Sequence, residues 1–258
     1  MVILKKIGEK YVQISGKFIK QNIYKIIWKG SMCSVNGKKY EQLVHSVVKK
    51  CHLNGSPEPF NKQEVHELAG SSSKIDIVCE GNIGIEVKKY NAPDWTQCCI
   101  KHNPVTGEWT GSNEIFNELL AEKRPFNGES PPFESCNMTH KEWLEVKNST
   151  NKWNDEYIDI PPDTIRRVYQ KKGCHYIQIS GGYGLYHLGV DVCGFGVPIF
   201  EIDQQLRIRT KIHTRKDKNG FCRLSVTAAC QPKNMKKFAK SPYSLDDKDK
   251  LPVNLTYI

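Results

Sequence analysis

The sequence lacks the signals that mark several classes of protein. No apolar run reaches the roughly 18 residues that suggest a membrane-spanning helix, and the apolar stretch within residues 1–6 is too short for a secretory signal peptide. No internal repeat is visible. Acidic side chains are fewer than basic ones, 28 against 38, which gives a formal net charge of +10. We therefore expect an intracellular protein without a membrane segment, and the charge favours a polyanionic partner.

The cysteines form no CxxC pair, which argues against a zinc finger or ribbon. Two groupings, Cys51-His52 with His66 and Cys98-Cys99 with His102, have spacings that are not typical of metal sites. Several cysteines fall inside apolar strand or helix patterns, so we predict reduced, buried thiols. The ten positions are Cys33, Cys51, Cys79, Cys98, Cys99, Cys136, Cys174, Cys193, Cys222 and Cys230.

A complete nucleotide-binding glycine motif is also absent. The stretch from Gly181 to Gly184 resembles the start of such a loop, but His187 stands where the third glycine belongs and no strand–helix–strand context surrounds it. We therefore predict no nucleotide site there.

The stretch over residues 74–89 predicts two short β-strands joined by a tight turn, because apolar and polar residues alternate around Gly81-Asn82. Glu86 and Lys88 are two residues apart, so their side chains project from the same face of one strand. Asp76 lies on the partner strand.

The length of the turn decides whether these three side chains meet. A two-residue loop over 81–82 would place Asp76 on the opposite face from Glu86. A three-residue loop over 81–83 pairs Asp76 with Lys88, and all three then share one face. Three-residue hairpins carry a left-handed residue, which Asn or Gly tolerates, so we predict a loop of odd length.

Two carboxylates and an ammonium group on one face of a sheet are costly unless an ion binds between them. A hard divalent cation suits this chemistry, because Mg²⁺ takes oxygen ligands and is usually held by one or two carboxylates together with phosphate and water. We therefore predict that Asp76 and Glu86 bind Mg²⁺, for which Mn²⁺ would substitute.

The order of Asp76, a short spacer and Glu86-Val87-Lys88 on a hairpin resembles the PD-(D/E)XK nuclease superfamily, which includes many type II restriction endonucleases. The resemblance covers about residues 38–98, with Ile75 at the position where the family has proline. It implies an α/β (α+β) fold with a restriction-endonuclease-like mixed β-sheet flanked by helices. It also implies that the Val87 carbonyl is a further metal ligand and that Lys88 orients the attacking water or stabilises developing charge.

A helix is predicted over residues 38–51 from apolar residues at helical spacing, namely Tyr40, Leu43, Val44, Val47, Val48 and Cys51. Glu41 lies on the flank of this stripe. The resemblance implies that Glu41 is an extra metal or water ligand, because family members often carry a glutamate on such a helix. It also makes Gln97, shortly after the Glu-x-Lys strand, a catalytic candidate. The alternatives are a surface glutamate in a first helical turn and an ordinary polar glutamine.

The chain is interpreted as a catalytic core over residues 1–172 and a β-rich part over residues 173–258, which is either a DNA-contacting part of the same domain or a small second domain. A helical and loop insertion is expected at about 101–160. Helices are predicted near 113–120, after a capping box at Thr139, and after residue 163. Strands are predicted at 11–14, 23–28, 175–179, 197–200, 206–214 and 221–230.

One predicted strand in the β-rich part has a basic face. Arg207, Arg209 and Lys211 alternate with apolar residues, so they project together. A basic strand face can follow a phosphate backbone, although the solvated face of an antiparallel sheet is an equally good explanation. Further DNA-binding candidates flank the hairpin, namely Ser72, Ser73 and Lys89.

We interpret the sequence as that of a Mg²⁺-dependent DNA endonuclease of the type II restriction kind. Cutting both strands of double-stranded DNA at a palindrome would require a homodimer. Three alternatives remain. The chain could be another nuclease of the superfamily, such as a junction resolvase or an exonuclease. It could be a non-catalytic DNA-binding module of the same fold, or an interaction protein whose three charged side chains form only a surface ion-pair cluster.

Overall fold

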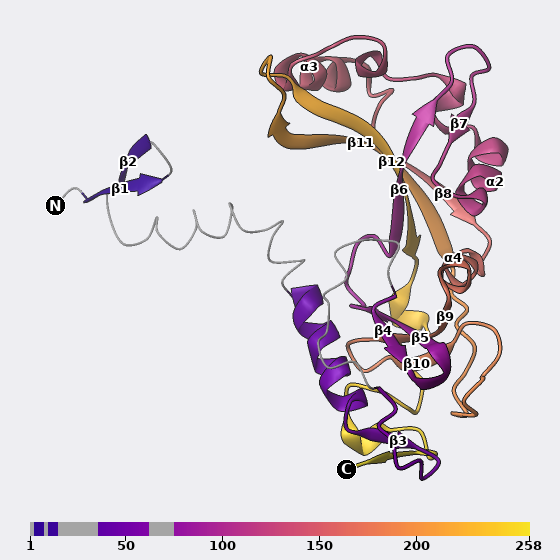
Figure 1. Ribbon diagram of the computed structural model, residues 1–258. Helices are drawn as coiled ribbons and strands as arrows, with labels where there is room; N and C mark the ends of the chain where they lie inside the picture. Colours follow the sequence, from indigo (N-terminus) through magenta and orange to yellow (C-terminus); the bar gives the residue numbers. More distant parts are fainter. Residues whose placement is uncertain (1–2, 8–9, 15–35, 62–74) are drawn as a thin grey trace.

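The computed structural model describes residues 3–7, 10–14, 36–61 and 75–258, which form an α+β fold with several β-sheets (Figure 1). One sheet has four strands in the order β10-β9-β5-β4, and another has five in the order β7-β6-β12-β11-β8. Two-stranded sheets are formed by β1 (Ile3–Ile7) with β2 (Lys10–Ile14), and by β3 (Cys51–Leu53) with β13 (Leu255–Tyr257). The predicted α+β class is confirmed at this level.

The four-stranded sheet is mixed. Its strands are β4 (Ile77–Cys79), β5 (Ile83–Lys88), β9 (Cys174–Ile179) and β10 (Gly184–His187). β5 and β9 run parallel, whereas β4 and β10 are antiparallel to their neighbours. A parallel pair needs a long crossover connection. Here the connection between β5 and β9 contains β6, β7, β8 and three α-helices.

β4 and β5 form the predicted hairpin, and its loop has the predicted odd length. Ile77 faces Ile85 and Cys79 faces Ile83, so the three residues Glu80–Asn82 form the loop as the 3-10 turn η1. The loop therefore begins one residue earlier than predicted.

The earlier loop shifts the strand pairing by two residues. Gly81 and Asn82 both adopt the left-handed conformation, with φ of +70° and +61°, which centres the turn on them. Continuing the observed register, Asp76 faces Glu86 instead of Lys88. A shift of two residues leaves every side chain on its predicted face.

The helix over residues 36–48 packs on one face of this sheet (Figure 1). Val44 and Val48 are fully buried in one hydrophobic cluster with Ile85 and Val87 of β5. The predicted stripe is narrower than expected, because Leu43 is 47% exposed. The helix also ends before the predicted residue, and Cys51 begins β3 instead.

α4 (Thr164–Lys172), which the sequence predicts, packs on the opposite face. Its buried Ile165 and Tyr169 belong to a second hydrophobic cluster with Ile177 and Ile179 of β9. The approach of β9 to β5 is closest at Gly84, where an added Cβ would overlap the carbonyl oxygen of Gly173. The sheet therefore has helices on both faces.

The five-stranded sheet is antiparallel throughout. Its strands are β6 (Thr96–His102), β7 (Trp109–Thr110), β8 (Glu156–Ile160), β11 (Gln204–Lys216) and β12 (Cys222–Pro232). Leu206 and Ile208 are buried while Arg207 and Arg209 are partly exposed, as the alternation predicts. Strands from both sides of residue 172 contribute to each of the two large sheets.

α2 (Glu114–Lys123) and α3 (His140–Thr150) lie beside this sheet (Figure 1). Both helices are predicted, and Thr139 and Glu142 form the predicted capping box. The strand predicted at 197–200 is wrong: Ile199 makes a single bridge to His187, and Pro198 lacks the N–H that a strand ladder needs. Residues 23–28 lie outside the described part.

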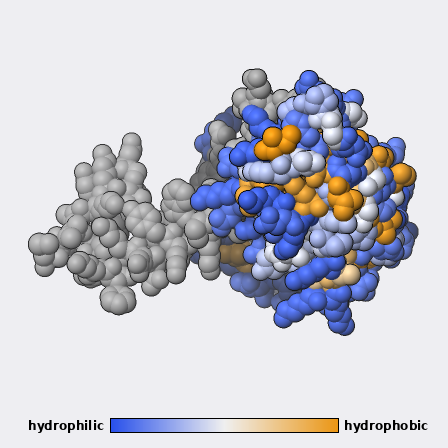
Figure 2. Space-filling view, turned by 90° about the horizontal axis from the view of Figure 1, so that it is seen from below, coloured by the Kyte–Doolittle hydropathy of each residue, from blue (hydrophilic) through white to orange (hydrophobic). Residues whose placement is uncertain are grey.

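Short 3-10 turns complete the described chain: η2 (Pro125–Gly128), η3 (Pro132–Glu134), η4 (Met235–Lys237) and η5 (Lys248–Lys250). All nine cysteines in the described residues are free thiols and five of them are buried, as predicted; Cys33 lies outside this part. Within these residues no helix has the length and apolar character needed to cross a membrane. Seen from below, apolar side chains gather in a patch bordered by hydrophilic ones (Figure 2).

Candidate active site

Asp76, Glu86 and Lys88 come together on the face of the four-stranded sheet that α4 covers. Lys88 Nζ lies 2.5 Å from Glu86 Oε1 and 3.7 Å from Asp76 Oδ2. The Val87 N–H donates a hydrogen bond of 2.8 Å to Asp76 Oδ2, which ties the chain before β4 to β5. Asp76 and Glu86 are buried, at 8% and 2% exposed. The structure thus places the three predicted side chains in one cluster.

α4 adds a second cation that the sequence analysis missed. Lys172 Nζ lies 2.7 Å from Glu86 Oε2, so each oxygen of this carboxylate faces its own ammonium group. The ammonium groups of Lys88 and Lys172 lie 5.5 Å and 5.9 Å from the ring centroid of Tyr169. The hydroxyl of Tyr169 donates to the carbonyl of Trp95. Tyr169 therefore fixes the space in which both ammonium groups sit.

Spacing could have indicated that Tyr169 and Lys172 act together, because residues three apart share one face of a helix. Spacing could not indicate that this face meets Glu86. That contact depends on the parallel pairing of β5 with β9, in which Glu86 faces Ile177 across 91 residues of sequence.

Neighbouring charges hold Glu86 and Lys88 in their ionised forms. Burial raises the pKa of Glu86, but Lys88 and Lys172 more than offset this and lower the pKa below its ordinary value. Burial lowers the pKa of Lys88, but Tyr169, Glu86 and Asp76 raise it well above its ordinary value. Lys88 is therefore an ammonium group at neutral pH, which can donate hydrogen bonds but cannot accept a proton.

Asp76 and Glu41 show the opposite tendency. Burial raises the pKa of Asp76; Lys88 offsets part of this effect and Glu86 adds to it. Glu41 lies on the helix over residues 36–48, and burial together with the charge of Asp76 raises its pKa to about 7. Glu41 also interacts electrostatically with Lys88 and Glu86, so its charge is felt at the cluster although its helix packs on the other face of the sheet. The two lysines therefore do not fully stabilise the ionised forms of all the carboxylates near this cluster.

This donor set fits a hard divalent cation. Asp76, Glu86 and Glu41 offer carboxylate oxygens, which are the ligands that Mg²⁺ prefers. A cation would also favour the ionised forms of Asp76 and Glu41, which the protein alone disfavours. Among residues 36–61 and 75–258, however, no three His, Cys, Asp or Glu side chains are arranged as a ready metal site. Lys88 lies between the two carboxylates and would have to move aside for an ion.

The other predicted site residues lie around this cluster or apart from it. Gln97 is exposed on β6, where it faces Ala229 of β12, and the described contacts include none between Gln97 and the cluster. Lys89 is half-buried and directly follows β5. Ser72 and Ser73 lie outside the described residues.

The predicted basic face of β11 is partly neutralised. Arg207 pairs with Asp155 at 2.8 Å and approaches Asp94 at 3.7 Å, and Arg209 pairs with Asp94 at 3.2 Å. Lys211 is half-buried opposite Ser225, and within the described part of the chain it has no ion pair with an acidic side chain. The two aspartates come from loops far away in sequence, so the strand pattern alone could not predict this pairing.

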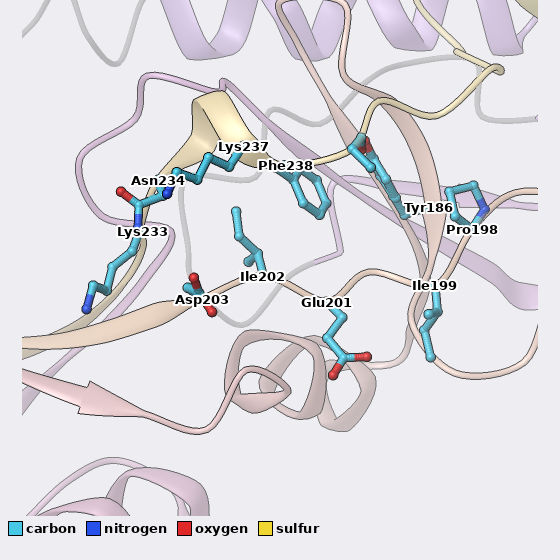
Figure 3. Close-up of a pocket in the computed structure, with 11 residues that line it drawn as sticks. Tyr186, Pro198, Ile199, Glu201, Ile202, Asp203, Lys233, Asn234, Lys237 and Phe238 are labelled. Atoms are coloured by element: carbon cyan, nitrogen blue, oxygen red, sulfur yellow. The ribbon is translucent and has the colours of Figure 1, made fainter.

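Two hollows in the described part of the structure lie away from this cluster. One, of about 310 Å³, is bordered by Tyr186, Ile202 and Phe238 together with Glu201 and Asp203 (Figure 3). Another, of about 490 Å³, lies between β7, α2 and η2. The charged cluster lines neither of them.

Comparison with known proteins identifies no relative: no family model, no curated protein and no solved structure matches this chain. The residues and their geometry therefore carry the functional argument.

Proposed function

We propose that this protein is a Mg²⁺-dependent DNA endonuclease with a restriction-endonuclease-like core. The observation that carries the proposal is the meeting of Asp76, Glu86 and Lys88 on one face of a hairpin, with Glu41 supplied by a helix on the other face of the sheet. A mixed sheet with helices on both faces and a net charge of +10 support the same function.

In this proposal Asp76 and Glu86 hold the metal, with Glu41 and the Val87 carbonyl as further ligands. Bound Mg²⁺, or Mn²⁺ in its place, supplies an acidified water and offsets charge on the phosphate. Lys88 donates hydrogen bonds to the attacking water or to a phosphate oxygen, and its fixed charge stabilises the negative charge that develops there. Lys172 positions the Glu86 carboxylate through its contact with Oε2.

The substrate in this proposal is double-stranded DNA, whose base pairs can open locally at the cut. Cleavage of both strands at a palindromic site would involve a homodimer, because the two-fold symmetry of the protein then matches that of the site. Lys211 on β11, which has no ion pair with an acidic side chain in the described residues, adds a positive charge that a phosphate backbone could follow.

One observation favours a second candidate, a DNA-binding module without catalysis. Both oxygens of Glu86 already contact ammonium groups, so this carboxylate is satisfied by Lys88 and Lys172 without any metal. This candidate predicts DNA binding that Mg²⁺ does not convert into cleavage.

Incubation of plasmid DNA with the protein and Mg²⁺ tests the proposal. We expect discrete fragments from the wild type and intact plasmid from Lys88→Ala. Among the ion pairs of the described residues, only Lys88 pairs with both Asp76 and Glu86, and the variant loses this charge. Lys141→Ala is the matched control, since Lys141 lies on the exposed side of α3 and pairs only loosely with Glu145 at 3.8 Å.

Two outcomes would contradict this expectation. Equal cutting by wild type and Lys88→Ala would remove Lys88 from the mechanism. DNA binding by the wild type without any cleavage in Mg²⁺ or Mn²⁺ would leave the binding module as the better account.

A further inference from the structure

The end of β5 leads directly into an exposed aromatic ring. Tyr90 follows Lys88 by two residues and is 44% exposed. Its N–H donates to Ser180 Oγ at 3.1 Å, and the Ser180 N–H donates to the Lys88 carbonyl at 2.9 Å. These two hydrogen bonds fix the backbone of Tyr90 relative to that of Lys88. The backbone that carries this exposed ring is therefore fixed two residues after Lys88.

The turn between β9 and β10 supports one side of this ring. Gly181 has a φ of +75°, and a Cβ at this position would lie 2.5 Å from Cδ1 of Tyr90. Glycine supplies both the left-handed conformation and the space for the ring. The ring of Tyr183 lies behind, with its centroid 5.9 Å from that of Tyr90 and an interplanar angle of 36°. The glycine-rich stretch from Gly181 to Gly184 thus makes room for the ring of Tyr90, a role that its resemblance to a nucleotide-binding loop does not indicate.

Two exposed lysines lie beside this support. The segment after β12 is held against the turn, because the Tyr183 hydroxyl donates to the Met235 carbonyl at 2.8 Å and the Ser241 N–H donates to the Tyr183 carbonyl at 2.8 Å. Lys240 Nζ lies 5.8 Å from the ring centroid of Tyr183. Lys236 and Lys240 are exposed, and the ion pairs of residues 75–258 include neither of them.

We infer that Tyr90 is a stacking platform for an unpaired nucleobase next to the cleaved phosphate, and that Lys236 and Lys240 bind neighbouring phosphates. Every base offers a flat face to an aromatic ring, and such stacking contributes about 1–3 kcal/mol per base. The ring is supported from behind and open in front, and it adjoins the cations that such a strand needs. The inference rests on the proposed function and deepens it: the preferred substrate is DNA with an unpaired nucleotide beside the cut.

Binding without metal tests the platform separately from cleavage. Fluorescence anisotropy in EDTA would compare a forked duplex with a fully paired duplex of the same length. We expect Tyr90→Ala to weaken binding of the forked DNA by about tenfold or more, from the stacking energy, with little change for the paired duplex. Tyr90→Phe, which keeps the ring, should retain the binding of the wild type.

Tyr257→Ala is the matched control. Tyr257 is 38% exposed and has a lysine ammonium, that of Lys50, 5.7 Å from its ring centroid, but it lies on β13. We expect this variant to bind both DNA molecules as the wild type does. Retained binding of the paired duplex by Tyr90→Ala also shows that the variant is folded.

A second measurement uses the wild type alone. With 2-aminopurine as the first unpaired base of the fork, stacking on Tyr90 should quench its fluorescence on binding. Three results would overturn the platform. Tyr90→Ala could weaken binding of the forked and the paired duplex equally, or weaken binding of neither. The 2-aminopurine fluorescence could also stay unchanged when the wild type binds. A wild type that quenches the probe and yet cuts no DNA in Mg²⁺ would instead overturn the endonuclease proposal and leave the platform standing.

Discussion

Two clusters in this protein combine cations with buried or half-buried acids on a β-sheet, but their charges are balanced differently. On the five-stranded sheet, Asp94 and Asp155 pair with Arg207 and Arg209. Burial lowers the pKa of Arg207, but the hydrogen bonds and charge of Asp155 raise it above its ordinary value. Lys147 also lies 3.8 Å from Asp155, so that cluster contains three cations for two acids, and each acid has a cationic partner.

The cluster on the four-stranded sheet has a surplus of acid. Lys88 and Lys172 both contact Glu86, and Asp76 and Glu41 retain raised pKa values. An ion-pair count alone would treat both clusters as salt-bridge networks. The balance of charge separates them: one is complete within the protein, and the other would be stabilised by an added cation.

The largest expected effect comes from removing one acid from each cluster. We expect Asp76→Asn to lower the rate of DNA cleavage by about 10²–10³-fold, the loss typical of removing one group that stabilises a transition state. Asp94→Asn should leave the cleavage rate of the folded protein unchanged. Single-turnover cleavage of plasmid DNA measures both rates.

Asp94→Asn should instead lower the free energy of unfolding by about 1–3 kcal/mol, because Arg207 and Arg209 lose part of their partner and are largely buried. Urea unfolding gives this value. If Asp76→Asn and Asp94→Asn cleave DNA at equal rates, the two clusters do not differ in their contribution to cleavage.

An effect of intermediate size is expected from Glu41→Gln. Glu41 has a pKa of about 7 in the folded protein against an ordinary value of 4.5, so the folded state holds a proton that the unfolded chain releases. A raised pKa contributes stability below about pH 4.5 that is lost as pH rises through 7. The variant has no such titration. The free energy of unfolding of the variant minus that of the wild type should therefore be larger at pH 8 than at pH 4, by at most about 3 kcal/mol.

Urea unfolding in EDTA at several pH values measures this difference, and adding Mg²⁺ should reduce it by stabilising the ionised Glu41 of the wild type. If the free energies of unfolding of wild type and Glu41→Gln change with pH in the same way, Glu41 does not have a raised pKa in the folded protein.

The smallest effect is expected on the five-stranded sheet. If its basic face follows DNA, Lys211→Ala should reduce the slope of log K against log salt concentration by about 1, with only a few-fold loss of affinity. Anisotropy titrations at several salt concentrations measure the slope, and Lys141→Ala serves again as the control. If the slope for Lys211→Ala is unchanged, Lys211 does not contact DNA phosphates and the basic face of β11 has only a structural role.

Local patterns predicted much of the fold and of the candidate site. Strand parity and the turn residues Gly81 and Asn82 were enough to place Asp76, Glu86 and Lys88 on one face, although the pairing is two residues away from the predicted one. Helical spacing and capping residues located the helix over residues 36–48, α3 and α4. These features depend on neighbours within a few turns or strand residues, so a short window of sequence contains them.

Contacts between distant segments could not be predicted in this way. Lys172 reaches Glu86 because β5 and β9 pair in parallel. Asp94 reaches Arg209 because it lies two residues before β6, which belongs to the same sheet as β11. Neither pairing leaves a periodic pattern. Gln97 was predicted from its spacing after the Glu-x-Lys strand alone, and the structure places it on β6 of the second sheet, opposite Ala229.

The close approach of β9 to β5 at Gly84 has a consequence for how this protein can change over generations. A single methyl group at that position would meet the carbonyl of Gly173 and force the strands apart, which would withdraw Lys172 from Glu86. Gly84 has no side chain to offer a substrate, yet any role that needs Lys172 beside Glu86 would also restrict this position to glycine.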